Sequence, residues 1–278
     1  MRPGGNPVSN ATSNVTAAGV PAKEITSLVC RALSAGVLLL AALTFAITDP
    51  NGDAHGDGTY VLPTRRALSA DALDLREFTA QTDGKTMTFR VSFGAMQNPW
   101  QLPGGQSAAV TDIFVKTGLG GANTLPELNL NVNEGWQYHV RVAGESATLD
   151  NVAADGKDIS RQSPPQVSVE GATLVVKTDI PAGKYGYWLT SSVYSPLTRT
   201  GLLTPGTQAG PAALSTARTN PPVPVDVLAP EGDFTAYTTH TLAAVGRARD
   251  DRPLLLGGLG GLGVILTVSS TLRLWRSG

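Results

Sequence analysis

The stretch TMTFRVSF, residues 86–93, alternates polar and apolar side chains over its whole length. In an extended chain, alternate side chains point to the same face, so the apolar ones gather on one side. An amphipathic helix would instead repeat every three to four residues. The stretch therefore predicts a β-strand with one face turned toward a core. The side chains on that face are Met87, Phe89, Val91 and Phe93.

Similar runs recur along the middle of the chain, separated by turn residues. They lie at 112–116, 137–142, 167–176 and 185–189. Glu170 and Gly171 interrupt the third run, which predicts a hairpin. In the first run both faces carry apolar residues, so we expect both faces to be partly covered. Many short strands at this spacing predict an all-β fold, an antiparallel β-sandwich or barrel.

Two segments of this region lack the strand pattern. Residues 71–78 are compatible with one helical turn. Residues 201–224 are rich in Pro, Ala, Thr and Gly, which predicts a long surface loop.

The chain is nearly neutral and poor in cysteine. Its 278 residues include 21 Lys and Arg and 22 Asp and Glu, for a net charge of −1. A protein that binds nucleic acid needs a basic surface for the phosphate backbone, so we expect no nucleic-acid partner. The single cysteine, Cys30, excludes an internal disulfide and a cysteine-based zinc or iron–sulfur site.

An apolar run near the N-terminus predicts export. Residues 32–46 read ALSAGVLLLAALTFA and follow Arg31. A run of about 15 residues suits the core of a secretory signal better than a membrane span. We expect residues 1–46 to be a polar lead plus signal peptide, cleaved near Ala46. The alternative is an uncleaved anchor, and a true start near Val29 would explain the long lead.

A second apolar run near the C-terminus predicts a membrane anchor. Residues 254–272 carry no charged side chain and are long enough to cross the ~30 Å hydrocarbon core. We expect one transmembrane helix there and a cytoplasmic tail at 273–278, where Trp275 suits the headgroup depth. The alternative is a buried glycine-rich core segment.

The two predicted membrane signals set the domain organisation. A β-sandwich module at 47–240 would lie on the extracytoplasmic side of a single-pass protein of the cell membrane, joined to its anchor by a stalk at 241–253. Gly257 and Gly261 form a GxxxG pair, which would allow a homodimer through the helix.

Five blocks spread over the predicted module are similar to a known family. They are DPNGDAHGDGTY at 49–60 with LPT at 62–64, DLREF at 74–78, FG at 93–94 with NPW at 98–100, LP at 125–126 with Asn129, GWQY at 135–138 and RV at 141–142, and DVLAPEG at 226–232. In this order they resemble the C-terminal module of glucodextranases and related envelope-bound proteins. The resemblance implies a DOMON-like, jelly-roll-like β-sandwich without a catalytic role, which binds sugar or holds a protein at the envelope. Ala54 departs from the family, which has an acidic residue there.

The opening loop carries oxygen side chains at positions 1, 3, 5 and 9: Asp49, Asn51, Asp53 and Asp57. Alternate side chains of such a loop can converge on a hard cation while backbone carbonyls complete the shell. It is not an EF-hand, because Ala54 and Tyr60 stand where that motif has Gly and Glu. The loop predicts a structural calcium site, and the alternative is a turn in which Asp and Asn side chains cap their own backbone.

Aromatic residues are the candidates for a sugar site. A flat ring can cover the apolar face of a pyranose while polar groups bind the hydroxyls. Trp100, in an Asn-Pro-Trp loop, Trp188 and Tyr194 are the residues proposed to bind a ligand, and the alternative for each is core packing. Some DOMON-type sandwiches hold haem between axial His and Met ligands. No pairing of His139 with Met87 or Met96 is indicated, so we do not expect haem.

No catalytic motif is present. The sequence has no GxSxG or HExxH, and we expect no enzyme activity. The function predicted from the sequence is a non-catalytic, membrane-anchored module that binds envelope or extracellular glycan. The alternative is a subunit or anchor of a surface-protein assembly, with an envelope protein as its partner and no small ligand.

Overall fold

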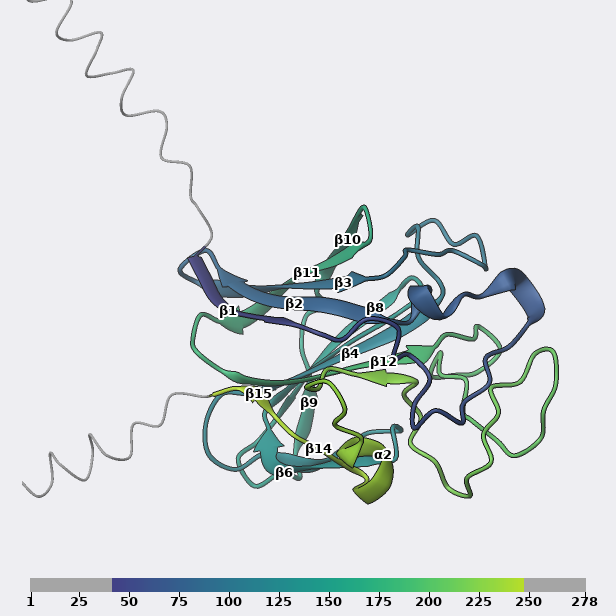
Figure 1. Ribbon diagram of the computed structural model, residues 1–278. Helices are drawn as coiled ribbons and strands as arrows, with labels where there is room; N and C mark the ends of the chain where they lie inside the picture. The colour runs from purple at the N-terminus through teal and green to yellow at the C-terminus, as the bar shows by residue number, and fades with distance from the viewer. Residues whose placement is uncertain (1–41, 248–278) are drawn as a thin grey trace, which may run out of the picture. The chain divides into compact units, whose positions relative to one another are not determined.

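The computed structural model describes residues 42–247, which form an all-β body (Figure 1). The first sheet has five strands in the order β1-β2-β3-β11-β10, and every neighbouring pair is antiparallel. The run that alternates most cleanly in the sequence is its central strand, β3, as predicted. The bounds are β1 (Ala42–Thr48), β2 (Leu75–Thr82), β3 (Thr86–Phe93), β10 (Gln166–Glu170) and β11 (Thr173–Pro181).

The second sheet has seven strands in the order β13-β12-β4-β7-β8-β9, with β15 also paired to β12. Its pairs are antiparallel too. The bounds are β4 (Ala109–Lys116), β7 (Tyr138–Ala143), β8 (Ser146–Val152), β9 (Ile159–Arg161), β12 (Gly186–Val193), β13 (Asp226–Val227) and β15 (Val245–Gly246).

A small third sheet, in the order β14-β6-β5, accompanies these two. β14 runs parallel to β6, whereas β5 is antiparallel to it. Only short helical elements occur in the described region. The bounds are β5 (Ala122–Leu125), β6 (Leu130–Trp136), β14 (Thr241–Leu242), α2 (Thr235–Thr239) and the 3-10 turns η1 (Arg65–Ala67) and η2 (Ala70–Ala72).

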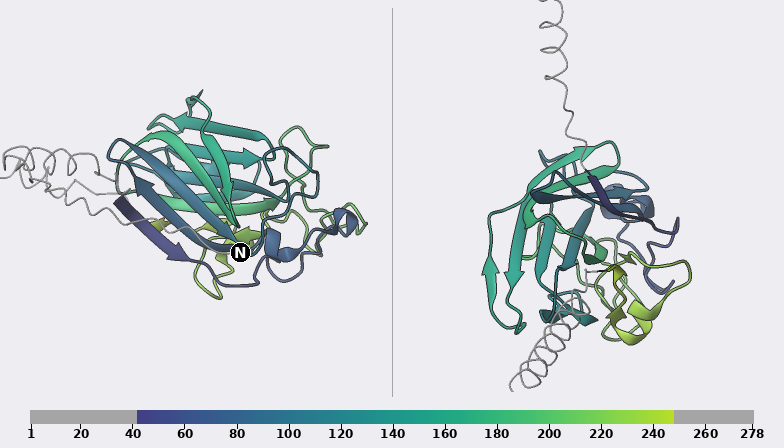
Figure 2. Two further views of the ribbon diagram at one scale, coloured as in Figure 1. Left: turned by 90° about the horizontal axis from the view of Figure 1, so that it is seen from above. Right: turned by 90° about the vertical axis from the view of Figure 1, so that its left-hand side faces the viewer.

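An aromatic cluster joins the first two sheets into a sandwich. The Tyr187 ring, from β12, lies 5.1 Å from Phe78 of β2 and 5.9 Å from Phe89 of β3, both in edge-to-face geometry. Such contacts add to the stabilisation that burial of the rings already provides. Figure 2 shows the two layers of strands from above and from the side.

β4 and β12 are covered on both faces. All eight residues of β12 are buried, as are the first seven of β4, so 112–116 is covered more fully than the predicted partial cover of both faces. The first sheet covers one face, and the third sheet contributes to the other, where Phe114 lies 5.3 Å from Trp136. By contrast, β3 buries only alternate residues, because its other face meets solvent.

The segments predicted to lack strands differ from expectation in detail. Within 71–78 only the end of η2 is helical, and β2 already begins at Leu75. Residues 201–224 contain no named strand, but the segment is not exposed throughout. Leu202, Leu214 and Val223 are buried in the core, because a long loop with apolar side chains lowers its free energy by packing them inward.

The sheets extend beyond the predicted module. β1 starts at Ala42 and so includes residues assigned above to the signal, while β14 and β15 lie in the predicted stalk. No helix among residues 42–247 is long and apolar enough to cross a membrane. The rest of the predicted signal, the span at 254–272 with Gly257 and Gly261, and the tail at 273–278 lie outside the described residues.

Candidate functional site

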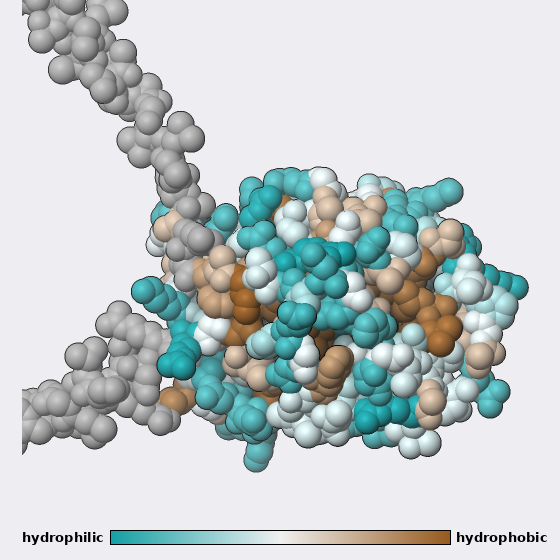
Figure 3. All heavy atoms as spheres, viewed as in Figure 1, coloured by the Kyte–Doolittle hydropathy of each residue, from teal (hydrophilic) through white to brown (hydrophobic). Residues whose placement is uncertain are grey.

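A cavity of about 260 Å³ opens at one end of the sandwich, where loops from distant parts of the chain meet. Its volume is just below the roughly 300–1,000 Å³ of typical small-molecule sites. In the space-filling view an apolar area lies at the right, at the end of the sandwich where the loops gather (Figure 3). The lining residues are Pro63, Arg65, Arg66, Leu68, Pro99, Trp100, Ser107, Ala108, Val193, Tyr194, Ser195, Leu197, Leu203 and Ala212.

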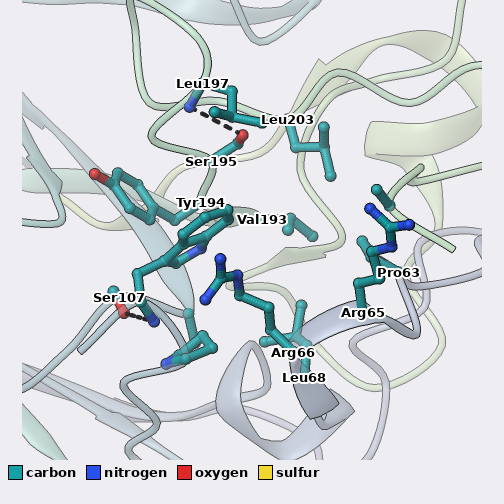
Figure 4. Close-up of a pocket in the computed structure, with 14 residues that line it drawn as sticks. Pro63, Arg65, Arg66, Leu68, Ser107, Val193, Tyr194, Ser195, Leu197 and Leu203 are labelled. Carbon is teal, nitrogen blue, oxygen red and sulfur yellow. Dashed lines mark hydrogen bonds between the residues drawn. The ribbon is translucent and has the colours of Figure 1, made fainter. Parts of the chain in front are cut away.

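Two of the predicted ligand-binding aromatics, Trp100 and Tyr194, line this pocket. Trp100 comes from the loop between β3 and β4, and Tyr194 follows β12 directly. Both rings are half-buried. In Figure 4, Arg65 and Arg66 enter from one side, and Tyr194, Ser195 and Leu197 lie on the other. The fold therefore brings together residues more than ninety positions apart, which no spacing rule would have joined.

Arg66 stacks on Trp100. The guanidinium carbon lies 4.0 Å from the centroid of the indole ring, which is a cation–π contact. The backbone of Arg66 has a φ of +67°, and Ala67 and Gln101 nearby have φ values of +49° and +56°. Such conformations are uncommon for residues other than Gly and are concentrated at functional sites. The wall of the pocket is thus held in a strained backbone conformation.

The Tyr194 hydroxyl is uncharged at neutral pH. Partial burial, followed by the negative charge of Glu145, raises the pKa of Tyr194 above its ordinary value. A neutral phenol can both donate and accept a hydrogen bond. At the rim, the Leu197 side chain is 85% exposed, which is unusual for a residue of this size and adds apolar surface beside the ring.

The ionisable side chains of the lining are two arginines and one tyrosine. The lining contains no His, Asp, Glu, Lys or Cys. The Ser107 hydroxyl donates to Asn98 Oδ1 at 2.6 Å, and the Ser195 hydroxyl accepts a backbone bond from Leu197 at 3.4 Å, so neither has a base beside it. What remains is an apolar, aromatic hollow with two guanidinium groups. Neither group forms an ion pair within the described part of the chain.

Trp188, the third predicted aromatic, lies in the core. It is 1% exposed, and its indole N–H donates to the carbonyl of Leu242 at 3.1 Å. The reason is its place on β12, a strand covered on both faces. Trp188 offers no face to a ligand, and we leave it out of the candidate site. Arg66 was not singled out from the sequence, because nothing local distinguishes it from any exposed arginine.

The opening loop contributes to a second cluster. Asp49, Asp53 and Asp226 each offer one carboxylate oxygen, and the three oxygens lie within 4.8 Å of one another. Two of the four predicted calcium ligands thus meet. Asn51 is exposed, and Asp57 instead pairs with Arg218 at 2.9 Å and accepts bonds from Thr59.

Asp226 was missed because it stands far from the loop in sequence. Its only signal was its position at the start of the block DVLAPEG. The backbone explains the meeting: Gly56 N–H donates to Val225 O at 2.8 Å, and Ala229 N–H donates to Asp49 Oδ1 at 3.1 Å, a bond that spans 180 positions. These bonds hold the loop that follows β1 against β13.

The electrostatics of the cluster are unfavourable for three ionised groups. Burial, with the neighbouring charges of Asp53 and Asp74, raises the pKa of Asp49 to about 8 against the opposing effect of the Ala229 bond. Burial and Asp74 also raise the pKa of Asp53. Burial and the charge of Asp49 raise the pKa of Asp226 well above its ordinary value. Each shift arises because removal from water and like charges both disfavour the carboxylate.

His139, considered above as a haem ligand, is engaged in the core. Its Nε2 lies 2.6 Å from Asp112 Oδ1, and its ring stacks on Phe114 with centroids 4.1 Å apart. Arg141 Nε donates to the same Asp112 oxygen at 2.6 Å. Although His139 alternates with apolar residues in the sequence, it is buried, because β7 is a central strand.

Comparison with known proteins identifies the family. No curated protein matches the chain. The family model described as the C-terminal binding module, SLH-like, of glucodextranase matches residues 44–184, which is half of the chain. The match runs from β1 to just before β12, so it includes Asp49, Arg66 and Trp100, whereas Tyr194 and Asp226 follow it. The resemblance seen in the sequence blocks is confirmed, and the chain belongs to the family of SLH-like, C-terminal binding modules of glucodextranase.

Proposed function

We propose that this domain is a non-catalytic module that binds a glycan of the cell envelope or the surrounding medium in the pocket between Arg66, Trp100 and Tyr194. The observation that carries the proposal is the Arg66–Trp100 stack on the wall of an apolar cavity, in which the guanidinium carbon lies 4.0 Å from the indole centroid. The Tyr194 ring suits the C–H face of a sugar, while the Trp100 indole holds the Arg66 guanidinium at the cavity. Guanidinium and phenol groups suit the sugar hydroxyls. Membership of a binding-module family supports the same conclusion.

The charge of the pocket favours an acidic glycan. Arg65 and Arg66 bring two positive charges, and no carboxylate lines the cavity. A planar guanidinium binds carboxylate or phosphate through two parallel hydrogen bonds, which a neutral sugar cannot offer. The proposed ligand is therefore one ring, or the end, of a polysaccharide that carries carboxylate or phosphate groups. The cavity volume of about 260 Å³ fits a single ring better than a chain segment.

Isothermal titration of the purified full-length chain tests the proposal. The panel contains a neutral glucan, a polyuronate and purified cell-wall polysaccharide. We expect binding to an acidic polymer, weakened at least tenfold by Trp100→Ala and by Arg66→Ala. Arg161→Ala and Phe234→Ala, at an exposed arginine and an exposed aromatic outside the pocket, should leave the affinity unchanged.

Three outcomes separate the alternatives. Equal binding to neutral and acidic polymers, still lost in Trp100→Ala, would retain the glycan site but reject its charge preference. Binding that survives both pocket variants would place the site elsewhere on the domain. No binding to any polymer would favour the second candidate, a subunit of a surface assembly, for which the exposed Leu197 is the specific observation.

We also propose that the module is held at the outer face of the cell membrane by residues 254–272. The support is the uncharged run itself, with Arg273 and Trp275 beyond it. The full chain should sediment with membranes, and a chain ending at Pro253 should not. Protease added to intact cells should degrade the domain, and protection of the domain would contradict the proposed orientation.

A further inference from the structure

Four carboxylates meet one permanent positive charge where the opening loop contacts β13. Asp74 is buried beside Asp49 and Asp53, and it is the member of this group that pairs with Arg76. Asp74 also accepts the Gly52 N–H, at 3.1 and 3.0 Å to its two oxygens. Arg76 also pairs with Asp71, at 3.4 Å, so its direct ion pairs go to Asp74 and Asp71. Asp49, Asp53 and Asp226 are left facing one another without a cation, and buried like charges are strongly unfavourable unless a positive charge joins them.

Two carboxylate oxygens of this group are buried without a hydrogen-bond partner. Asp49 uses Oδ1 for the Ala229 N–H, and its buried Oδ2 has no hydrogen-bond partner. Asp53 Oδ1 is likewise buried without a partner. Asp226 receives the N–H groups of Leu75 and Val227 at 2.7 and 2.8 Å, which fixes the orientation of its carboxylate. Polar atoms that are removed from water without a partner are rare in folded proteins and require an explanation.

Tyr237 is a second, independent sign of a ligand at this point. The residue lies on α2, outside the acidic group, and is only 3% exposed. Its hydroxyl is buried and has no hydrogen-bond partner. Burial, followed by the charges of Asp226, Tyr60, Asp53 and Asp49, raises the pKa of Tyr237, so its hydroxyl stays neutral at this place in the fold. The Tyr237 hydroxyl is therefore a buried neutral oxygen near the three acidic residues that bonds to no described group, which makes it an available ligand.

We propose that one divalent cation, Ca²⁺, binds between Asp49, Asp53 and Asp226, with the Tyr237 hydroxyl beside it. Ca²⁺ takes six to eight oxygen ligands at about 2.3–2.6 Å, so two oxygens on one ion are at most about 5 Å apart. The three carboxylate oxygens lie within 4.8 Å of one another, as this requires. Hard carboxylate and neutral oxygens without any sulfur or imidazole favour this ion over transition metals.

The cation would act as a clamp between the two ends of the module. Asp49 and Asp53 flank the turn after β1, whereas Asp226 begins β13. A cation that binds only this folded arrangement stabilises it by mass action. At a hundredfold excess of Ca²⁺ over its Kd, a domain of this size should gain about 5–10 °C in Tm.

Thermal unfolding and calorimetry of the full-length chain test the clamp. Tm is measured in chelator, in Ca²⁺ and in Mg²⁺, and Ca²⁺ binding is titrated calorimetrically. Terbium supplies an optical probe, because a nearby tyrosine such as Tyr237 sensitises its emission and Ca²⁺ should displace it. We expect a rise in Tm with Ca²⁺, a smaller rise with Mg²⁺, and a stoichiometry of one ion.

Variants test whether Ca²⁺ binds at the three proposed ligands or to the acidic loop in general. Asp53→Asn, in the half-exposed turn, should lose the Ca²⁺ response yet be at least as stable as the native chain in chelator, because one repulsive charge is gone. Asp226→Asn should also lose the response. Asp57→Asn and Asn51→Ala, matched controls in the same loop, should keep it. A Tm that ignores both Ca²⁺ and chelator, or a response that survives Asp53→Asn and Asp226→Asn, would overturn the proposal.

Discussion

The guanidinium of Arg66 covers the indole ring of Trp100 at 4.0 Å, although the arginine is exposed and 34 positions separate the two. A double-mutant cycle with Arg66→Ala and Trp100→Ala should give a coupling free energy of unfolding of about 0.5–1 kcal/mol, typical of an exposed cation–π pair. Arg66→Lys should retain only part of this coupling, because an ammonium lacks the planar face. Urea denaturation measures it, and additive single effects would mean that the stack does not form in solution.

The buried ion network around Asp112 should be a major contribution to stability. Asp112 Oδ1 lies 2.6 Å from both His139 Nε2 and Arg141 Nε, and Asp112 is wholly buried. Without the Asp112 charge, the mostly buried Arg141 keeps only its pair with the half-exposed Glu127, so Asp112→Asn should lower the free energy of unfolding by about 3 kcal/mol, near the low end for a broken buried pair. Asp150→Asn is the matched control. Its partner Arg161 is 61% exposed and reaches water when the pair is broken, so the loss should be at most about 1 kcal/mol.

The same network predicts how stability depends on pH. Burial alone would raise the pKa of Asp112, but Arg141 and His139 outweigh it and hold the pKa below its ordinary value of 3.8. The unfolded chain therefore binds the proton more readily than the folded one. This contribution is fully present above about pH 4 and is lost as the pH falls through the lowered pKa. Unfolding free energies measured from pH 7 down to pH 2 should fall less steeply in Asp112→Asn than in the native chain.

Gly121 should tolerate no side chain. Its φ is +96°, and an added Cβ would lie 2.2 Å from the carbonyl oxygen of Trp136. Gly121→Ala should destabilise the domain by more than about 1 kcal/mol, because both the backbone conformation and the space oppose it. Gly118, three positions earlier, has open space and no positive φ, so Gly118→Ala should stay within about 0.5 kcal/mol of the native chain. Equal effects at both positions would contradict this account of the turn.

Phe45 tests whether β1 belongs to the mature fold. Its ring lies 5.4 Å from Tyr187 and 6.2 Å from Phe78. Because it is only half-buried, Phe45→Ala should cost about 1–3 kcal/mol, less than the roughly 3–5 kcal/mol of a fully buried Phe. Thr48→Ala, at an exposed position of the same strand, is the control. Mass spectrometry of the cellular protein shows where its N-terminus lies, and a chain that begins at Ile47 would lack this contact altogether.

Local chemistry was sufficient to predict the class of the fold. The alternation in 86–93 defines β3 and its buried face, because the side chains of a strand alternate between its two faces and this pattern is visible in consecutive residues. Glu170 and Gly171 mark the hairpin between β10 and β11 for the same reason: Gly171 adopts a φ of +62°, which Gly allows without strain. The family resemblance, too, is carried by short blocks that can be read without a structure.

Tertiary structure alone decided the sites. Whether Trp188 packs inside or faces a ligand depends on the sheets laid over β12, and whether Asp226 joins Asp49 depends on a contact across almost the whole module. Arg66 looks like any surface arginine until the loop that carries Trp100 lies beneath it. The alternation of strand residues and the preferences of turn residues depend on a few neighbours in the sequence. The burial of a side chain, its contacts and the clustering of charges depend on neighbours in space. The sequence by itself therefore determined the strands and the family, and the packing of distant loops decided which side chains meet.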